Sequence, residues 1–154
     1  PDLVVTTSSR PGFENTDYTP DGYVEFWRTL TEIGIPVVGI RDTPWLVDDA
    51  GDPYKATDCV AGGGDPVTCG PLRERVLSPG DPAQGILEHM PGGYALDFSD
   101  VICGPVHCPA VIGNIYVYRD DNHLSDHFAR SLSDEMKRRM APILEDIENQ
   151  GATA

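Results

Sequence analysis

A chain of 154 residues is long enough to form one domain with a substantial hydrophobic core. Its formal net charge of −14 excludes the basic surface that nucleic-acid binding requires and disfavours binding to anionic lipid surfaces. No apolar run approaches the roughly 18 residues needed to cross a bilayer, so the sequence predicts no transmembrane helix.

The first part of the chain alternates predicted strands and helices. Residues 3–7 are apolar enough for a buried strand, and the polar segment 8–12 follows it. Apolar residues then recur at three- and four-residue intervals over 21–33, which predicts a helix ending at Gly34. Its repeating positions are Tyr23, Phe26, Trp27, Leu30 and Ile33. Residues 35–40 are predicted to form a parallel strand buried on both faces.

The middle of the chain is dense in Gly, Pro and Asp. Residues 46–70 are predicted to form an irregular surface excursion. Short helices are predicted at 71–77 and 82–89, each with a proline in its first turn. Alternation over 94–98 predicts a short strand, and residues 103–118 suggest a cross-linked turn followed by a two-stranded excursion.

A long helix is predicted from about Ser125, a favourable N-cap residue. An i, i+4 stripe on it predicts core packing and consists of Leu124, Phe128, Leu132, Met136 and Met140. Pro142 is expected to kink or end this helix. The alternation of strands and helices with short links predicts an α/β three-layer sandwich with a parallel sheet.

The four cysteines fall into two local pairs among Gly and Pro residues. Three connectivities are possible, and the sequential one, Cys59–Cys69 with Cys103–Cys108, closes the shortest loops. A zinc site is the alternative, but structural zinc ligands usually sit about two to four residues apart and neither pair is C-x-x-C. Disulfides are therefore favoured, and they indicate a location outside the cytosol.

Residues 118–125 carry the strongest chemical signal. Asp120 and His123 lie three positions apart in a loop between an apolar, strand-like run and the last helix. A carboxylate that accepts from one imidazole nitrogen leaves the other nitrogen free as a general base. Because parallel sheets bind ligands at the carboxyl ends of their strands, this loop, residues 8–10 and residues 41–42 are expected to converge on one edge.

Other interpretations of the same loop remain open. His123 would have a structural role if it merely capped the helix that follows. Asp121 is interpreted as a solvated loop carboxylate. Asp120, His123 and His127 have the spacing of a possible metal set, but Leu124 occupies the position where the zinc-protease motif requires Glu, so no metal is predicted. His89 and His107 are interpreted as surface residues.

The string Tyr118-Arg119-Asp120-Asp121-Asn122-His123-Leu124-Ser125 resembles the D-x-x-H block of SGNH (GDSL-like) esterases and acyltransferases. It is similar in particular to the C-terminal domain of bacterial integral-membrane O-acyltransferases. The resemblance implies an SGNH/flavodoxin-like fold in which Asp120 and His123 belong to a Ser-His-Asp triad. The family's G-D-S nucleophile block has no counterpart here. Residues 1–154 are thus expected to be the C-terminal portion of a single SGNH-like domain, incomplete at its N-terminus and inactive alone.

The resemblance also implies what the parent protein does. It would transfer or hydrolyse O-acyl groups, typically O-acetyl, on a cell-envelope glycan or glycolipid outside the cytoplasm, without a cofactor. Its expected partners are the acyl donor, that acceptor, the missing N-terminal part of the domain and a membrane acyltransferase domain. Many family members carry G-x-N-D where this chain has residues 8–10, so Ser9 and Arg10 are assigned to the oxyanion and substrate side.

The alternative is a non-catalytic glycan-binding or interaction domain that keeps the fold. Aromatic residues would then stack on sugars, and Trp45 is the candidate that looks exposed. Core packing explains Tyr23, Phe26 and Trp27 better than sugar binding does. A serine in a G-D-S context upstream in the parent protein would distinguish the enzyme from the binding domain.

Overall fold

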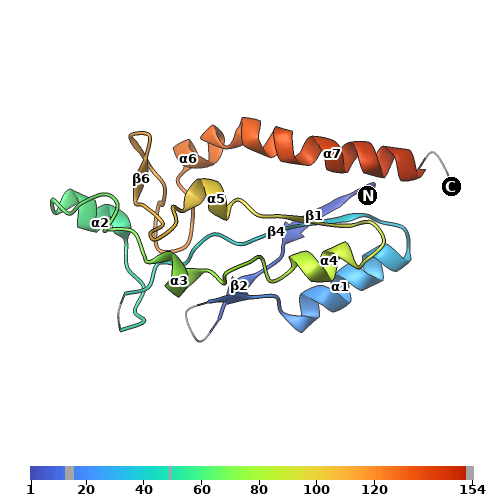
Figure 1. The fold of residues 1–154 in the computed structure, drawn as a ribbon, viewed down its shortest axis with the longest axis horizontal. Helices are drawn as coiled ribbons and strands as arrows, with labels where there is room; N and C mark the ends of the chain where they lie inside the picture. The colour runs from blue at the N-terminus through green and yellow to red at the C-terminus, as the bar shows by residue number, and fades with distance from the viewer. Residues whose placement is uncertain (13–15, 49, 152–154) are drawn as a thin grey trace.

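A three-stranded parallel sheet forms the centre of the computed structural model, which describes residues 1–12, 16–48 and 50–151. Its strands are β1 (Val4–Thr7), β4 (Val37–Ile40) and β5 (Gly93–Leu96), in the order β1-β4-β5. Val37 and Val38 of the central strand are fully buried, as the apolar run at 35–40 predicts. Helices lie on both sides of the sheet (Figure 1), which confirms the α/β class with a parallel sheet.

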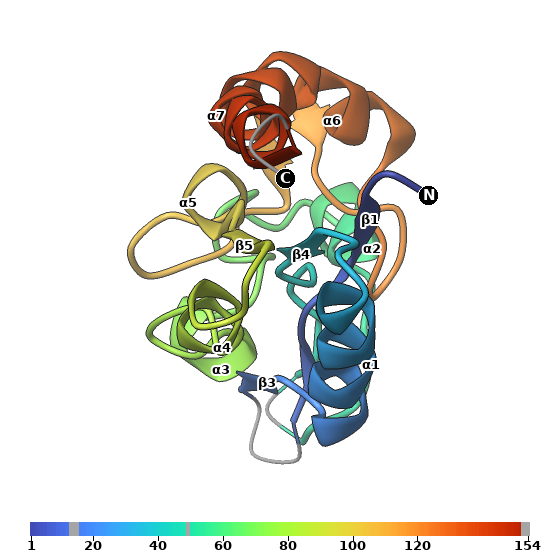
Figure 2. The same ribbon diagram turned by 90° about the vertical axis from the view of Figure 1, so that its right-hand side faces the viewer.

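The two faces of the sheet carry different helices, as Figure 2 shows. Helices α1 (Asp21–Glu32) and α4 (Gln84–Glu88) cover one face, and α6 (Asp126–Ser131) and α7 (Ser133–Gly151) lie on the other side. The structure has two hydrophobic cores. The smaller one contains Trp27, Val37 and Leu87, and the larger one contains Val38 and Phe128. The sheet is therefore the middle layer of three.

Helix α1 buries a narrower stripe than its sequence predicts. Trp27 is fully buried, but Phe26 is 52% exposed and Ile33, just beyond the helix, is 69% exposed. At about 100° per residue, positions 26 and 33 lie roughly 60–80° away from position 23, at the edge of the apolar face. A sheet of three strands is too narrow to cover that edge. Gly34 ends the helix with φ +79°, as predicted.

The predicted C-terminal helix is divided in two at Leu132. Ser125 caps α6, because its Oγ accepts a hydrogen bond from the Phe128 amide at 3.1 Å. Pro142 lies inside α7 and does not end it. The position is exposed, so water can satisfy the carbonyl that loses its helical partner. The predicted stripe packs against the larger core, with Phe128 buried and the other members partly buried.

The remaining elements lie mainly at the end of the molecule where the strands finish. The short helices are α2 (Ala56–Ala61), α3 (Arg73–Val76) and α5 (Ser99–Ile102); the two-residue strands are β2 (Arg10–Pro11), β3 (Asp17–Tyr18), β6 (Val111–Ile112) and β7 (Ile115–Tyr116). Composition did not predict α2 or α5. The β6–β7 hairpin and both disulfides, Cys59–Cys69 and Cys103–Cys108, are formed as predicted.

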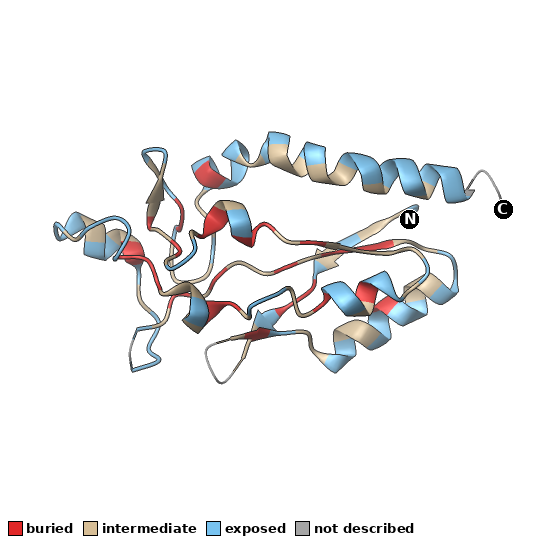
Figure 3. Ribbon diagram, in the orientation of Figure 1, coloured by how far each residue is buried: buried red, intermediate tan, exposed pale blue. Residues whose placement is uncertain are grey.

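Burial follows this layout. Buried residues concentrate on the sheet and on the segments that leave its strands, whereas the outer side of α7 is exposed (Figure 3). Within the described residues, no helix is both long and apolar enough to cross a membrane.

Candidate active site

Asp120 and His123 form a hydrogen-bonded pair in a tight loop. Tyr118 and Leu124 pair as an antiparallel bridge, and the Arg119 amide donates to the His123 carbonyl at 2.9 Å, which closes the loop. His123 Nδ1 lies 2.9 Å from Asp120 Oδ1 and 3.0 Å from Oδ2. The His123 side chain is 61% exposed, and within the described residues its Nε2 has no hydrogen-bond partner. The pair thus has the geometry of a carboxylate that orients a general base.

The surroundings of Asp120 keep its carboxylate ionised. Its Oδ1 accepts from the backbone amides of His123 at 2.8 Å and Asn122 at 3.1 Å. Partial burial acts to raise the pKa of Asp120, but these two amides, the His123 imidazole and Arg119 outweigh it. Together they hold the pKa of this carboxyl well below its usual range, so it is an anion at neutral pH.

Residues 43–46, which follow β4, hold the Asp120–His123 loop through its backbone carbonyls. Thr43 Oγ1 donates to the Asn122 carbonyl at 2.9 Å, and the Leu46 amide donates to the Asp121 carbonyl at 2.7 Å. These bonds fix the backbone that carries Asp120 and His123. The sequence predicted that residues 41–42 lie at this edge but did not predict the contact that Thr43 makes with the loop.

Ser9 and Arg10 lie at the same edge of the sheet but differ in accessibility. Ser9 is fully buried, and its Oγ accepts from the Asp42 amide at 3.0 Å. Arg10 is exposed, with its guanidinium carbon 6.0 Å from the centroid of the Trp45 ring. Trp45, which is half-buried, donates from Nε1 to Asp42 Oδ2 at 3.3 Å. Residues 8–10, the segment 41–45 and the Asp120–His123 loop therefore converge, as predicted.

A buried ion cluster fixes the same edge. The Arg41 guanidinium makes two 2.8 Å hydrogen bonds to Asp17 and one of 2.9 Å to Asp97, and its side chain is 1% exposed. Burial acts to raise the pKa of Asp17, but Arg41 and Ser78 outweigh it and lower that pKa. The cluster joins the ends of β4 and β5 to β3. It was not predicted, because its members are far apart in sequence.

No nucleophile faces His123 within the described residues. Its imidazole hydrogen-bonds to Asp120, and no serine or cysteine of the described part of the chain contacts it by a hydrogen bond. Ser8 is fully buried against Gly39 and its Oγ has no partner. The described residues also contain no group of three His, Cys, Asp or Glu side chains placed to hold a metal ion.

Open space adjoins the site on the β1 side. A shallow cavity of about 320 Å³ is lined by residues 5–7 of β1 and residues 40–43 at the end of β4. Strand β1 pairs with β4 on one edge, and among the described residues no strand pairs with its other edge. The carboxyl end of β1 is thus open to a further segment of protein.

A parallel α/β sandwich with a His–Asp pair at the carboxyl edge of its sheet defines a class of hydrolase and acyltransferase domains. Residues 3–138 match the family model described as "SGNH domain (fused to AT3 domains)". The match covers most of the chain, which therefore belongs to the SGNH domain family of these acyltransferase fusions. No match was found among curated proteins or among solved structures.

Proposed function

We propose that this chain supplies the general base and its orienting carboxylate for O-acyl transfer or ester hydrolysis on a cell-envelope glycan or glycolipid. The observation that carries the proposal is the pair His123–Asp120, at 2.9 Å, with two backbone amides holding the carboxylate ionised. Family membership supports a hydrolase or acyltransferase type of domain. The acyl group is expected to be acetyl.

The nucleophile in this proposal is a serine outside the 154 residues. Among the described residues, one edge of β1 has no partner strand, and a cavity lies at the carboxyl end of β1. A further strand could pair with that edge, and its carboxyl end would bring a serine toward His123. His123 Nε2 takes the serine proton as the Oγ attacks the acyl carbonyl, and the donor alcohol then leaves with that proton. In the second half, the same nitrogen deprotonates a sugar hydroxyl or water as its oxygen attacks the acyl carbonyl. The bond to the serine Oγ then breaks, the Oγ takes the proton back from His123, and the acyl group leaves on the sugar or as the free acid.

Arg10 is proposed to face the substrate, because it is exposed at the same edge while the Ser9 side chain is buried beneath it. A cationic side chain there would stabilise the oxyanion that forms during acyl transfer. Ser9 is proposed to act through the backbone, by fixing the Asp42 amide.

An extracytoplasmic location is part of the proposal. Two disulfides and no free cysteine among the described residues support it, because such bonds persist in oxidising compartments. The fusion to AT3 domains that the family description names supports a parent protein tethered to a membrane acyltransferase domain.

The test is His123→Ala in the intact parent protein. Glycan acetylation in cells should fall at least about 10³-fold at unchanged protein level, because the serine loses its base. His127→Ala is the matched control: it changes an exposed histidine on the next helix and should keep wild-type acetylation.

Two outcomes would contradict the proposal. Wild-type acetylation by His123→Ala would favour the non-catalytic glycan-binding domain instead. The isolated 154-residue chain should not hydrolyse p-nitrophenyl acetate; robust hydrolysis sensitive to serine reagents would place the nucleophile inside this chain.

A further inference from the structure

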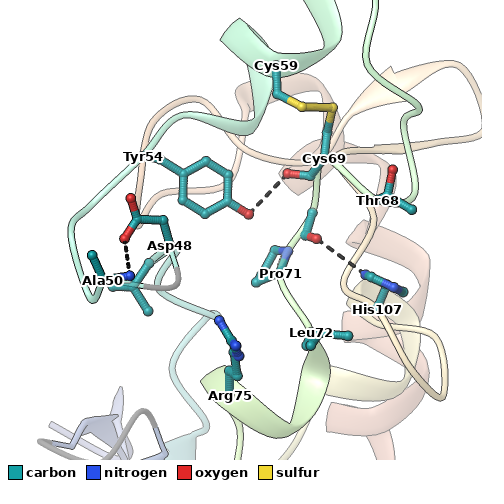
Figure 4. A pocket seen from close by; sticks show the side chains of 12 residues that line it. Asp48, Ala50, Tyr54, Cys59, Thr68, Cys69, Pro71, Leu72, Arg75 and His107 are labelled. Carbon is teal, nitrogen blue, oxygen red and sulfur yellow. Dashed lines mark hydrogen bonds between the residues drawn. A yellow bond between two sulfur atoms is a disulfide. The ribbon is translucent and has the colours of Figure 1, made fainter.

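The excursion at residues 46–70 forms two cavities that the catalytic pair does not use. The first, of about 560 Å³, has walls that include Tyr54, the Cys59–Cys69 disulfide, Arg75 and His107 (Figure 4). The second, of about 580 Å³, is lined on its polar side by Lys55, Asp58 and Asp121. Tyr54 and Cys59 line both cavities, so the two cavities adjoin at these residues.

Tyr54 is held at a fixed distance from the catalytic loop. Its amide donates to the Leu46 carbonyl at 3.1 Å, and the Leu46 amide donates to the Asp121 carbonyl at 2.7 Å. Tyr54 and Asp121 of the loop that carries His123 line the same cavity. The Tyr54 hydroxyl donates to the Cys69 carbonyl at 3.0 Å, and Figure 4 shows this hydrogen bond below the disulfide.

The chemistry of these walls fits a polyhydroxylated ring. The half-buried Tyr54 ring offers an apolar face, and Pro71 and Leu72 extend that surface into the first cavity. The second cavity also offers a charged hydrogen-bond donor, Lys55, and a charged acceptor, Asp58. A sugar has apolar C–H faces and a rim of hydroxyls that both donate and accept. An acyl chain would leave the charged groups unpaired.

The two cavities that Tyr54 lines are together called the Tyr54 groove. We propose that the Tyr54 groove binds sugars of the acceptor glycan that neighbour the acylated sugar. This inference rests on the proposed function and names the specificity-determining surface of the same site. The groove reaches the catalytic loop at Asp121, so a chain of sugars lying across Tyr54 would present its next hydroxyl to His123.

The experiment uses the intact parent protein and two readouts. Transfer to chemically de-O-acylated envelope glycan reports acceptor binding, whereas p-nitrophenyl acetate hydrolysis needs no glycan. Tyr54→Ala should raise the KM for the glycan about tenfold and change ester hydrolysis less than about twofold. Tyr54→Phe keeps the ring but loses its hydrogen bond to the Cys69 carbonyl, so it should raise the KM less than Tyr54→Ala does. Phe26→Ala, which removes an exposed aromatic ring from α1, is the matched control and should change neither readout.

An unchanged glycan KM in Tyr54→Ala overturns the Tyr54 groove. If that variant loses both activities through misfolding, the double variant Lys55→Ala/Asp58→Ala replaces it as the test, because both side chains are exposed and their removal should not unfold the domain. A raised glycan KM in the double variant supports the groove, and an unchanged KM overturns it. If the wild type hydrolyses no ester, the proposed function fails separately. Equilibrium binding of the same glycan should still weaken about tenfold in Tyr54→Ala, and equal binding would overturn the groove.

Discussion

At the scale of single residues, the site depends on which carboxylate orients His123. Asp120 contacts Nδ1 with both oxygens, whereas the neighbouring Asp121 lines the second cavity and accepts the Leu46 amide through its backbone. The two residues are adjacent in sequence and identical in chemistry. Their roles differ because the loop closes between Tyr118 and Leu124 and directs the Asp120 side chain toward the imidazole.

Asp120→Asn should therefore lower kcat of the intact protein by up to about 10⁴, since an amide cannot hold the correct imidazole tautomer. Asp121→Asn is the matched control and should keep kcat within a few-fold of wild type. Steady-state rates of acyl transfer at matched protein levels measure both effects. A larger loss in Asp121→Asn than in Asp120→Asn would show that the loop rearranges and that Asp121 orients the base.

At the scale of elements, the excursion that carries α2 depends on a covalent link. The Cys59–Cys69 disulfide joins α2 to the segment that precedes α3 across a separation of ten residues. Tyr54 donates to the carbonyl of Cys69, so the position of the Tyr54 ring depends on the same link. The disulfide thus adds a covalent link to a segment whose Leu46 and Ala56 side chains are buried in the larger core.

Replacing Cys59 and Cys69 together by Ser should lower the free energy of unfolding by about 2–3 kcal/mol in the chain-entropy model. The matched double replacement of Cys103 and Cys108 removes a link across a separation of five and has a smaller entropic effect, about 2 kcal/mol. Urea unfolding measures both, after peptide mapping without reductant has verified the pairings. A crossed pairing, or no loss of stability in the first variant, would contradict this assignment.

At the scale of the whole molecule, the Arg41 cluster makes stability depend on pH. The pKa of Asp17 is lowered in the folded protein. A lowered pKa means that the unfolded chain binds the proton more readily, so the stabilisation is fully present above the unfolded pKa of about 4 and is lost as pH falls through the folded pKa. Because the cluster joins β3 to the ends of β4 and β5, this loss weakens the carboxyl edge of the central sheet.

Asp17→Asn should cost about 3–5 kcal/mol of unfolding free energy at neutral pH, because it leaves the buried Arg41 without its bidentate partner. The cost should shrink as the pH falls below about 4, because the unfolded wild-type chain then binds a proton at Asp17 that the folded state binds only at lower pH. Urea midpoints measured from about pH 2 to pH 7 test this, and Asp2→Asn, an exposed substitution, controls for the change in net charge. A cost that stays constant down to the lowest pH would show that the ion pair is not its source.

Local patterns in the amino-acid sequence determine several features of this protein by themselves. The cap at Ser125 and the D-x-x-H string report interactions between residues close in sequence, so the start of α6 and the Asp120–His123 pair were predictable. The apolar run at 35–40 reports burial on both faces, so β4 was predictable although its partner strands are distant in sequence. The two disulfides were predictable because each closes a short loop.

The tertiary structure alone decided which distant groups meet. Arg41 contacts Asp17 and Asp97 across 24 and 56 positions, and Thr43 reaches Asn122 across 79. The small sheet left Phe26 exposed although its periodicity predicts burial. Sequence periodicity describes one element at a time, whereas the width of the sheet and the loops that meet at its edge arise from packing all the elements together. That packing decides how the Asp120–His123 loop is supported.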